Sequence, residues 1–305
     1  MSTTAKRPVP TAGIGSAAAS LAVVLWGLGN VLVKHIRLSG LAIACNRLWL
    51  GAIVFTLLLL ARGGRITRRS LRAALPGGLA FSLDLVLFFI AIKHTSVADA
   101  SIITALQPAL VFVVAGRIFG EKVSRSTIAW TAVAVAGTAV AVVGSSNAAG
   151  RTLSGDLLAA ASLGAWSWYF VASKQCRQQF GALEYQAALT IIAAIVVTPA
   201  AVIASRDLVI HDASTFGWIV VMVVVPGGGH LIMNWAHEFT SITLASTLTL
   251  AIPVIATVGA AILLGEAVTL VQTAGMAVVI LALAMVLRRP LATMAVIETP
   301  SPESP

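Results

Sequence analysis

The stretch TSVADASIITALQPALVFVVAGRIFGE, residues Thr95 to Glu121, returns as TSITLASTLTLAIPVIATVGAAILLGE at residues Thr240 to Glu266. The two copies align without a gap at an offset of 145 (240 − 95). They share 10 of 27 positions: the Thr-Ser start, an Ala-Ser pair, one Thr, one Pro, one Val, one Ala and the Gly-Glu end. A common apolar composition produces Val and Ala matches, but it does not align Pro, Gly and Glu in one register. We therefore interpret the chain as an internal duplication.

The composition indicates the solvent in which the chain folds. Hydrophobic residues make up 58% of the 305 residues and charged residues only 10%, with a mean hydropathy of +0.96. These values exclude an ordinary soluble protein and predict a polytopic protein of the lipid bilayer. The net charge of +9 does not indicate a nucleic-acid partner, because Lys and Arg cluster in short connections between apolar segments. Cys45 and Cys176 are isolated, so no disulfide, metal site or cofactor is predicted.

Ten apolar segments have roughly the 20 residues that a helix needs to cross a bilayer. They lie near 14–34, 41–61, 74–92, 97–117, 126–145, 155–173, 183–204, 216–236, 241–263 and 268–287. The predicted fold class is therefore an all-α integral membrane protein with ten transmembrane helices. Residues 1–12 and 289–305 are predicted to be disordered cytoplasmic tails.

The basic residues predict the orientation of these helices. With the N-terminus inside, 14 Lys and Arg fall in cytoplasmic segments and 5 on the opposite side, and Arg47 lies within a helix, which accounts for all 20. The positive-inside rule then places both termini in the cytoplasm, and we predict an inner-membrane location. The duplicated stretches are the fourth and ninth helices, which cross in opposite directions. A weaker match, at offset 140, sets Trp26 and Lys34 against Trp166 and Lys174. We predict an inverted 5+5 repeat, residues 13–145 and 155–288.

Several motifs follow one another in a specific order across the two halves. They are Trp26-Gly27 with Asn30 and Lys34, Arg47, the Thr-Ser…Ala-Ser…Pro…Gly-Glu pattern twice, and Gln272 followed by Gly275. Over residues 14–288 the chain resembles the drug/metabolite transporter superfamily, EamA-like family. The resemblance implies ten helices around a central substrate cavity, and many such proteins export amino acids or other small metabolites. The first half departs from the pattern, because Trp130 takes the position that matches Gly275.

Three charged residues lie within apolar segments, where a charge is costly. Asp84 is the deepest acid, midway along the third helix, Arg47 is two turns inside the second, and Asp99 is near the outer end of the fourth. Arg47 and Asp99 are interpreted as structural charges, because both can reach the interface. For Asp84 two interpretations stay open. It is a member of an ion pair, or it is a protonation site or a partner for a cationic substrate group.

The eighth helix contains Pro226-Gly227-Gly228-Gly229, a poor helix interior. We predict that this break faces the third helix near the midplane and places Asp84 opposite His230. The alternative is close packing of another helix on the glycines. His230 and Asn234 lie four residues apart on one face, as candidates for substrate binding or proton relay. His237 and Glu238 are expected to be solvated at the helix end.

The remaining candidate residues occupy equivalent helices. The expected wall of a substrate cavity consists of Trp26, Asn30, Trp166 and Tyr169. Four hydroxyl residues at equivalent positions are candidates for substrate contact or for hydrogen bonding to their own backbone near Pro108 and Pro253: Ser101, Thr104, Ser246 and Thr249. Glu121 and Glu266 are each expected to cap the helix that follows.

Together these features predict a secondary transporter of a small-molecule substrate, an exporter and not an enzyme. No Walker A motif is present in the printed sequence, so ATP is not expected as a direct energy source. Proton coupling through Asp84 is one hypothesis and an uncoupled facilitator is another. A lipid- or polyprenol-modifying membrane enzyme and a non-transporting membrane subunit are less favoured alternatives. The Ala- and Gly-rich fifth and tenth helices are candidates for packing or for a homodimer.

Overall fold

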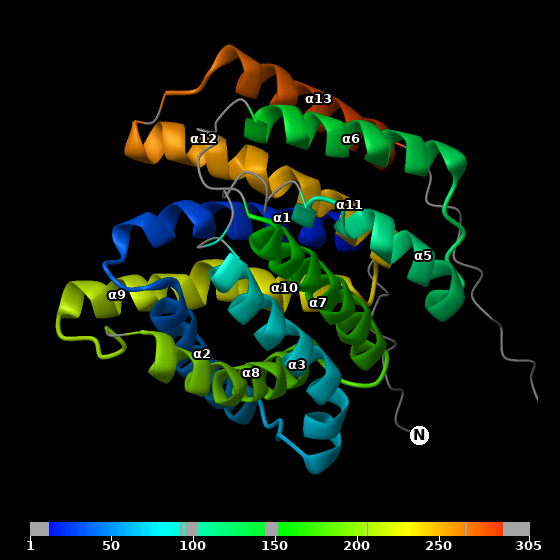
Figure 1. The fold of residues 1–305 in the computed structure, drawn as a ribbon. Helices are drawn as coiled ribbons and strands as arrows, with labels where there is room; N and C mark the ends of the chain where they lie inside the picture. Colours follow the sequence, from blue (N-terminus) through cyan, green and yellow to red (C-terminus); the bar gives the residue numbers. More distant parts are fainter. Residues whose placement is uncertain are drawn as a thin grey trace, which may run out of the picture.

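The computed structural model describes residues 12–91, 94, 103–143, 152–205, 207–265 and 267–288. All regular elements in this part of the chain are helical (Figure 1). In chain order they are α1 (Ala12–Leu32), η1 (Val33–His35), α2 (Gly40–Ala61), α3 (Arg68–Ala91), α5 (Gln107–Phe119), α6 (Arg125–Val143), α7 (Leu153–Arg177), α8 (Ala182–Ala204), α9 (Ala213–Met222), η2 (Val223–Gly227), α10 (Gly228–Ala236), α11 (Ile242–Leu248), η3 (Thr249–Ala251), α12 (Ile252–Leu264) and α13 (Leu270–Leu287).

Eight helical stretches of the described residues are long and apolar enough to cross a membrane. The predicted number was ten, and this count does not confirm it. Two segments account for the difference. The described part of the fourth segment contributes only the 13 residues of α5. α7 has 25 residues, but it carries several serines, Asp156, Lys174 and Arg177, which lower its hydropathy. The prediction of a multi-pass helical membrane protein is confirmed, because eight such stretches occur in one chain.

Local sequence explains where the duplicated helices begin and end. Ser241 caps α11, because its side chain accepts a hydrogen bond from the Leu244 amide. α5 and α12 end at Gly120 and Gly265, with φ angles of 65° and 67°. A left-handed φ favours glycine, which explains why the Gly of the Gly-Glu pair recurs at the same point in both copies.

Apolar segments that are equivalent in the two sequence halves pack against each other. α2 packs on α8, α6 on α13, and α5 of the fourth segment packs on α11, which begins the ninth segment. Figure 1 shows α6 and α13 side by side, apart from the group formed by α2, α3 and α8. A Cβ atom at Gly275 would lie 2.4 Å from the backbone nitrogen of Ala141, and Gly137 lies at the same contact. Trp130 stands in α6 where the repeat matches Gly275, and a bulky residue there does not favour close packing. Gly137 of α6 supplies the small residue that the contact requires instead.

The glycine-rich segment of the eighth helix does not break it. Val223–Gly227 form one π turn around Pro226, and the helix continues as α10. A Cβ at Gly229 would lie 3.0 Å from the Trp26 ring, and one at Gly29 would lie 2.8 Å from Pro226. The glycines therefore permit close packing of α1 on this helix, which was the alternative interpretation. Gly227 also lines the central cavity described below.

Several helix ends meet at one side of the molecule. The Arg69 guanidinium lies 5.6 Å from the centroid of the Phe180 ring. This contact places the α2–α3 connection next to the α7–α8 connection. The start of α1 lies beside the α10–α11 connection. Gly15 is so close to it that an added Cβ atom would lie 2.7 Å from the carbonyl oxygen of Phe239. We call this side, with the α2–α3, α5–α6, α7–α8 and α10–α11 connections, the basic face.

Candidate functional site

A small cavity lies at the centre of the described residues, between α2, α3, α8, α9, η2 and α10. We call it the central cavity. Its room for water is about 20 Å³, enough for about one molecule. The lining consists of Arg47, Leu48, Gly51, Phe55, Phe81, Gln186, Thr190, Met222, Val223, Gly227 and His230. Four of these residues are polar, and one of them carries a permanent charge.

Aromatic rings surround His230 beside this cavity. The His230 ring centroid lies 4.9 Å from that of Trp26 and 4.8 Å from that of Phe81. Trp166 stacks on Tyr169 at 5.2 Å and meets Trp26 edge-on at 5.5 Å. The structure thus brings together Trp26, Trp166 and Tyr169, three of the four residues expected in the wall.

The fourth expected wall residue, Asn30, is exposed and is not part of this cluster. The cluster includes an aromatic residue that was not expected, Phe81 of α3, because a lone Phe in an apolar segment carries no pattern. Trp26 has a buried indole nitrogen with no hydrogen-bond partner in the described part of the chain.

Buried hydrogen bonds fix the polar groups of α10. The Nδ1 atom of His230 lies 3.1 Å from the Tyr169 hydroxyl. Asn234 Nδ2 donates to Gln186 Oε1 at 2.7 Å. Asn234 is completely buried and Gln186 is 1% exposed, so neither amide has access to bulk solvent. Gln186 was not among the expected site residues, although its place within an apolar segment could have indicated it.

The two central charges have different surroundings. Asp84 accepts a hydrogen bond from Ser162 Oγ at 2.6 Å. The guanidinium of Arg47 faces the central cavity and interacts with Asp84 electrostatically. No hydrogen bond or ion pair to Arg47 occurs within the described ranges, and none joins Asp84 to His230. The expected juxtaposition of the third and eighth helices is made by Phe81 and His230 instead.

The hydroxyl residues of the duplicated stretches lie beside the kinks before the prolines. Ser246 Oγ donates to the Thr243 carbonyl at 3.0 Å, which is the backbone alternative. Thr249 Oγ1 donates to the Ser246 carbonyl at 2.6 Å and also reaches Gln107 Oε1 at 2.9 Å, across to α5. Thr104 is half-buried. Ser101 and Asp99 lie outside the described residues.

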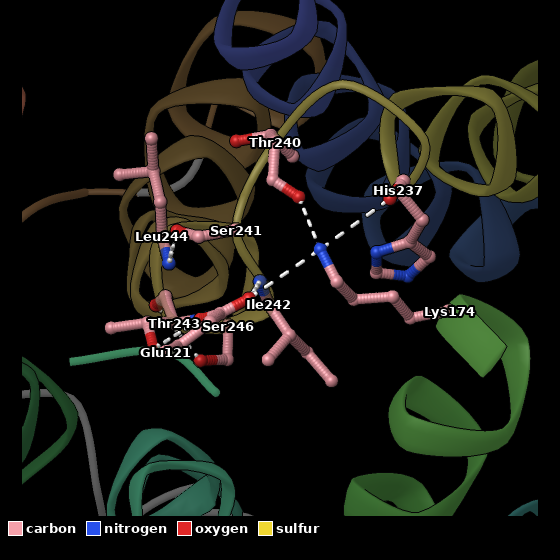
Figure 2. A network of polar contacts seen from close by, with 9 residues as sticks. All are labelled: Glu121, Lys174, His237, Thr240, Ser241, Ile242, Thr243, Leu244 and Ser246. Atoms are coloured by element: carbon pink, nitrogen blue, oxygen red, sulfur yellow. Dashed lines mark hydrogen bonds and ion pairs between the residues drawn. The ribbon is translucent and has the colours of Figure 1, made fainter. Parts of the chain in front are cut away.

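A buried charge network ties α5 and α7 to the α10–α11 connection (Figure 2). Lys174 Nζ lies 3.4 Å from Glu121 Oε1, 2.6 Å from the Thr240 carbonyl oxygen and 3.5 Å from that of His237. The Glu121 carboxylate accepts hydrogen bonds from the amides of Ile242 and Thr243, at 2.8 and 3.1 Å, and from the Thr243 hydroxyl at 2.7 Å. Glu121 therefore caps α11, where a negative charge favours the helix N-terminus.

Arg177 strengthens the same network. Its Nε donates to the Asn234 carbonyl at 2.8 Å, at the C-terminus of α10, and its guanidinium pairs with Glu238. His237 is 2% exposed, and both its ring nitrogens lack partners among the described atoms. Burial, with Lys174 and Arg177 nearby, lowers the pKa of His237 to about 3. We call Glu121, Lys174, Arg177 and residues 237–243 the clasp.

The clasp corrects two expectations and adds a feature that was not expected. Lys174 and Arg177, which were counted only as orientation signals, are each 5% exposed and bind partners inside the protein. The Glu238 side chain is 49% exposed, as expected, but His237 is buried rather than solvated. Glu121 caps α11 of the other sequence half, not the following helix α6. The equivalent Glu266 lies outside the described residues.

The model of the EamA-like transporter family matches residues 13–143 and 153–288. The chain belongs to the EamA-like transporter family. The resemblance inferred from the sequence motifs is thereby confirmed. The pseudopaline exporter CntI of Pseudomonas aeruginosa, from strains UCBPP-PA14 and PAO1, is 31% identical over 110 residues. That similarity covers 35% of this chain and 39% of the exporter.

A protein of known crystal structure has the same fold. It superposes with a TM-score of 0.76, covering 89% of this chain and 96% of its own, at 21% identity. At this identity the likeness concerns the fold alone. Members of the EamA-like family are transporters, which is consistent with the expectation of a non-enzymatic protein.

Proposed function

We propose that this chain exports a small organic metabolite, an amino acid or a related compound, by alternating access between two inverted five-helix repeats. The observation that carries the proposal is the packing of equivalent segments on each other: α2 on α8, α6 on α13, and α5 of the fourth segment on α11 of the ninth. Two family matches, one in each half, and the partial similarity to an exporter support it. Inverted repeats allow the two halves to exchange conformations and so to expose one site to each side in turn.

The central cavity is the proposed substrate site. Phe55 and Phe81 line it, and the cluster of Trp26, Trp166 and Tyr169 lies behind His230, so its surroundings fit an organic compound better than an inorganic ion. Its small volume corresponds to a conformation closed around the site. Opening of the cavity is therefore a required step of the transport cycle.

We assign the basic face to the cytoplasm, because the Lys- and Arg-rich connections gather there. The clasp then closes part of the cytoplasmic side, since Glu121 of the first half holds the N-terminus of α11 in the second. Substrate uptake from the cytoplasm requires that this contact loosens. Asp84, the deepest acid, is the proposed proton-coupling residue.

Flux measurements on purified protein in proteoliposomes test this function. Compounds that raise the melting temperature in a metabolite screen would be followed across an imposed pH gradient. We expect gradient-driven accumulation by the wild type and its loss in Asp84→Asn, while Asp212→Asn, at the exposed cap of α9, behaves as the wild type.

Each other outcome removes a defined part of the proposal. Accumulation by Asp84→Asn that still follows the pH gradient excludes the proton role of Asp84. Movement only down the concentration gradient of the compound identifies an uncoupled facilitator. Absence of flux for every compound that binds would contradict the transport function itself.

A further inference from the structure

The hydrogen-bonding groups of the central cavity are mainly donors. Arg47 contributes a guanidinium that has no hydrogen-bond partner among the described residues. Gln186 Oε1 is occupied by Asn234 Nδ2, so the amide turns its Nε2 donors away from Asn234. No carboxylate of the described chain lines the cavity. A site with an unpaired cation and a free amide donor is suited to an anionic group.

His230 adds a third donor. When the Tyr169 hydroxyl donates to Nδ1 across the 3.1 Å contact, the proton of the neutral imidazole lies on Nε2. The Thr190 hydroxyl donates to backbone carbonyls of its own helix, so it adds no donor to the cavity. The polar lining therefore presents hydrogen-bond donors from α2, α8 and α10.

Other buried cations of the protein show what Arg47 lacks. Lys174 binds two carbonyl oxygens and Glu121, and Arg177 binds a carbonyl oxygen and Glu238. A cation inside the membrane without such partners is costly, so its presence indicates a function. Asp84 compensates the charge of Arg47 at a distance, while its own hydrogen bond goes to Ser162.

We propose that Arg47 is the anchor for a carboxylate group of the transported compound, with Gln186 and His230 as additional donors. This inference rests on the proposed function. A guanidinium presents two parallel N–H donors to the two oxygens of a carboxylate. The cavity, which has room for about one water molecule in this conformation, must widen to admit such a group. Asp84 competes with the ligand for the positive charge of Arg47, so its negative charge weakens carboxylate binding.

A second, wider cleft provides a route to this anchor. It has a volume of about 610 Å³ and opens between α2, α8 and α10 at the basic face. Leu59 and Leu183 line it, about one helical turn from Phe55 and Gln186 of the central cavity, and so does Leu231, which directly follows His230. The apolar cluster that contains Phe55, Leu59 and Val223 lies between the two spaces. Rotation of these side chains would connect them.

Binding measurements with matched acids and amides test the anchor. Propionate, benzoate and phenylacetate would each be compared with the corresponding neutral amide, by calorimetry on the full-length protein in nanodiscs. We expect at least one acid to bind about tenfold or more tightly than its amide. Arg47→Gln should abolish this preference, and Gln186→Glu, of the same shape but opposite polarity, should do the same.

Asp84→Asn distinguishes an anchor from a structural ion pair. If Arg47 serves the ligand, removal of the competing carboxylate should raise the affinity for the acid several-fold. If Arg47 only pairs with Asp84, both single variants should weaken binding alike, and this result would overturn the proposal. Arg47→Lys keeps the charge without the planar fork and should retain part of the preference, which covers the case in which Arg47→Gln does not fold.

Two further results would also overturn the proposal: no acid binds better than its amide, or Arg47→Gln keeps the full preference. Flux on the same preparation separates this inference from the proposed function. A protein that transports but shows no Arg47-dependent preference remains an exporter without this anchor. A protein that shows the preference but transports nothing keeps the anchor and loses the export function.

Discussion

Both the clasp and the central cavity contain cations, buried in the clasp and half-buried in the cavity, and these cations have different partners. In the clasp, Lys174 and Arg177 bind helix-end carbonyls and carboxylates. In the cavity, Arg47 has only the distant charge of Asp84 among the described residues. A cation whose partners all belong to the protein holds a conformation, whereas one that faces a cavity without partners is free to bind a ligand. On the proposed function, the clasp stabilises one state of the protein and the central cavity binds the substrate.

Breaking the clasp should have the largest effect. Lys174→Met leaves Glu121 buried beside an apolar side chain, and loss of one partner of a buried pair costs about 3–5 kcal/mol. We expect a lower melting temperature in detergent, measured by tryptophan fluorescence. Lys122→Met, at an exposed lysine next to Glu121, is the control. Adding Glu121→Gln should restore part of the stability, and a double variant as unstable as the sum of both changes would contradict the pairing.

The buried imidazole of the clasp should make stability depend on pH. Burial, Lys174 and Arg177 lower the pKa of His237 from 6.5 to about 3. Between these values only the unfolded chain takes up the proton, so stability is complete above pH 6.5 and falls as the pH decreases. From pH 7 to pH 5 the loss amounts to about 2 kcal/mol. Melting curves of His237→Phe should fall less steeply with decreasing pH. Exposed His211→Gln should match the wild type, and equal slopes for all three would disprove this explanation.

A smaller effect is expected at the central aromatic cluster. Tyr169→Phe removes the hydroxyl that contacts His230 Nδ1 and leaves that buried nitrogen without its partner, at a cost of about 1–2 kcal/mol. Urea or thermal unfolding would measure the loss, with exposed Trp168→Phe on the same helix as the control. In a His230→Ala background, Tyr169→Phe should lower the stability only slightly, because the imidazole that contacts the Tyr169 hydroxyl is already absent. Independent, additive losses would show that the two side chains do not interact.

The smallest change should follow from trimming the clasp. Thr243→Val removes one of the hydrogen bonds to Glu121, whose carboxylate still accepts hydrogen bonds from the Ile242 and Thr243 amides. We therefore expect the free energy of unfolding to fall by about 1 kcal/mol. Made in a Glu121→Gln background, the same change should have a smaller effect on the melting temperature. An unchanged effect in both backgrounds would place the contribution of the Thr243 hydroxyl elsewhere.

The sequence predicted features that depend on composition and repetition. The apolar segments, the family motifs and the meeting of Trp26 with Trp166 follow from residue types at regular spacing. The paired glycine ends of α5 and α12 also recur in the sequence, because each needs a left-handed φ.

Pairings between segments far apart in the chain were not predictable in this way. Glu121 was expected to cap the next helix, but it caps α11, 121 residues away. Lys174 was interpreted by its position at a helix end, and its burial depends on the carbonyl groups that α10 presents. For Arg47 the sequence indicated its depth in the membrane, but not whether a hydrogen-bond or ion-pair partner lies within reach. Single-sequence patterns describe a helix and its faces, and the choice of neighbour is made by the packing of the whole bundle.

The π turn at Val223–Gly227 closes over one residue more than an α turn. It therefore accommodates that residue with about the rotation of one ordinary turn, and α10 keeps the rotational phase of a continuous α-helix. His230 stays beside Tyr169, and Asn234 stays beside Gln186. The same residue inserted into a regular α-helix would rotate all of α10 by about 100° and remove both side chains from their partners. The wide turn thus absorbs a change in chain length by one and preserves the chemistry of the cavity wall.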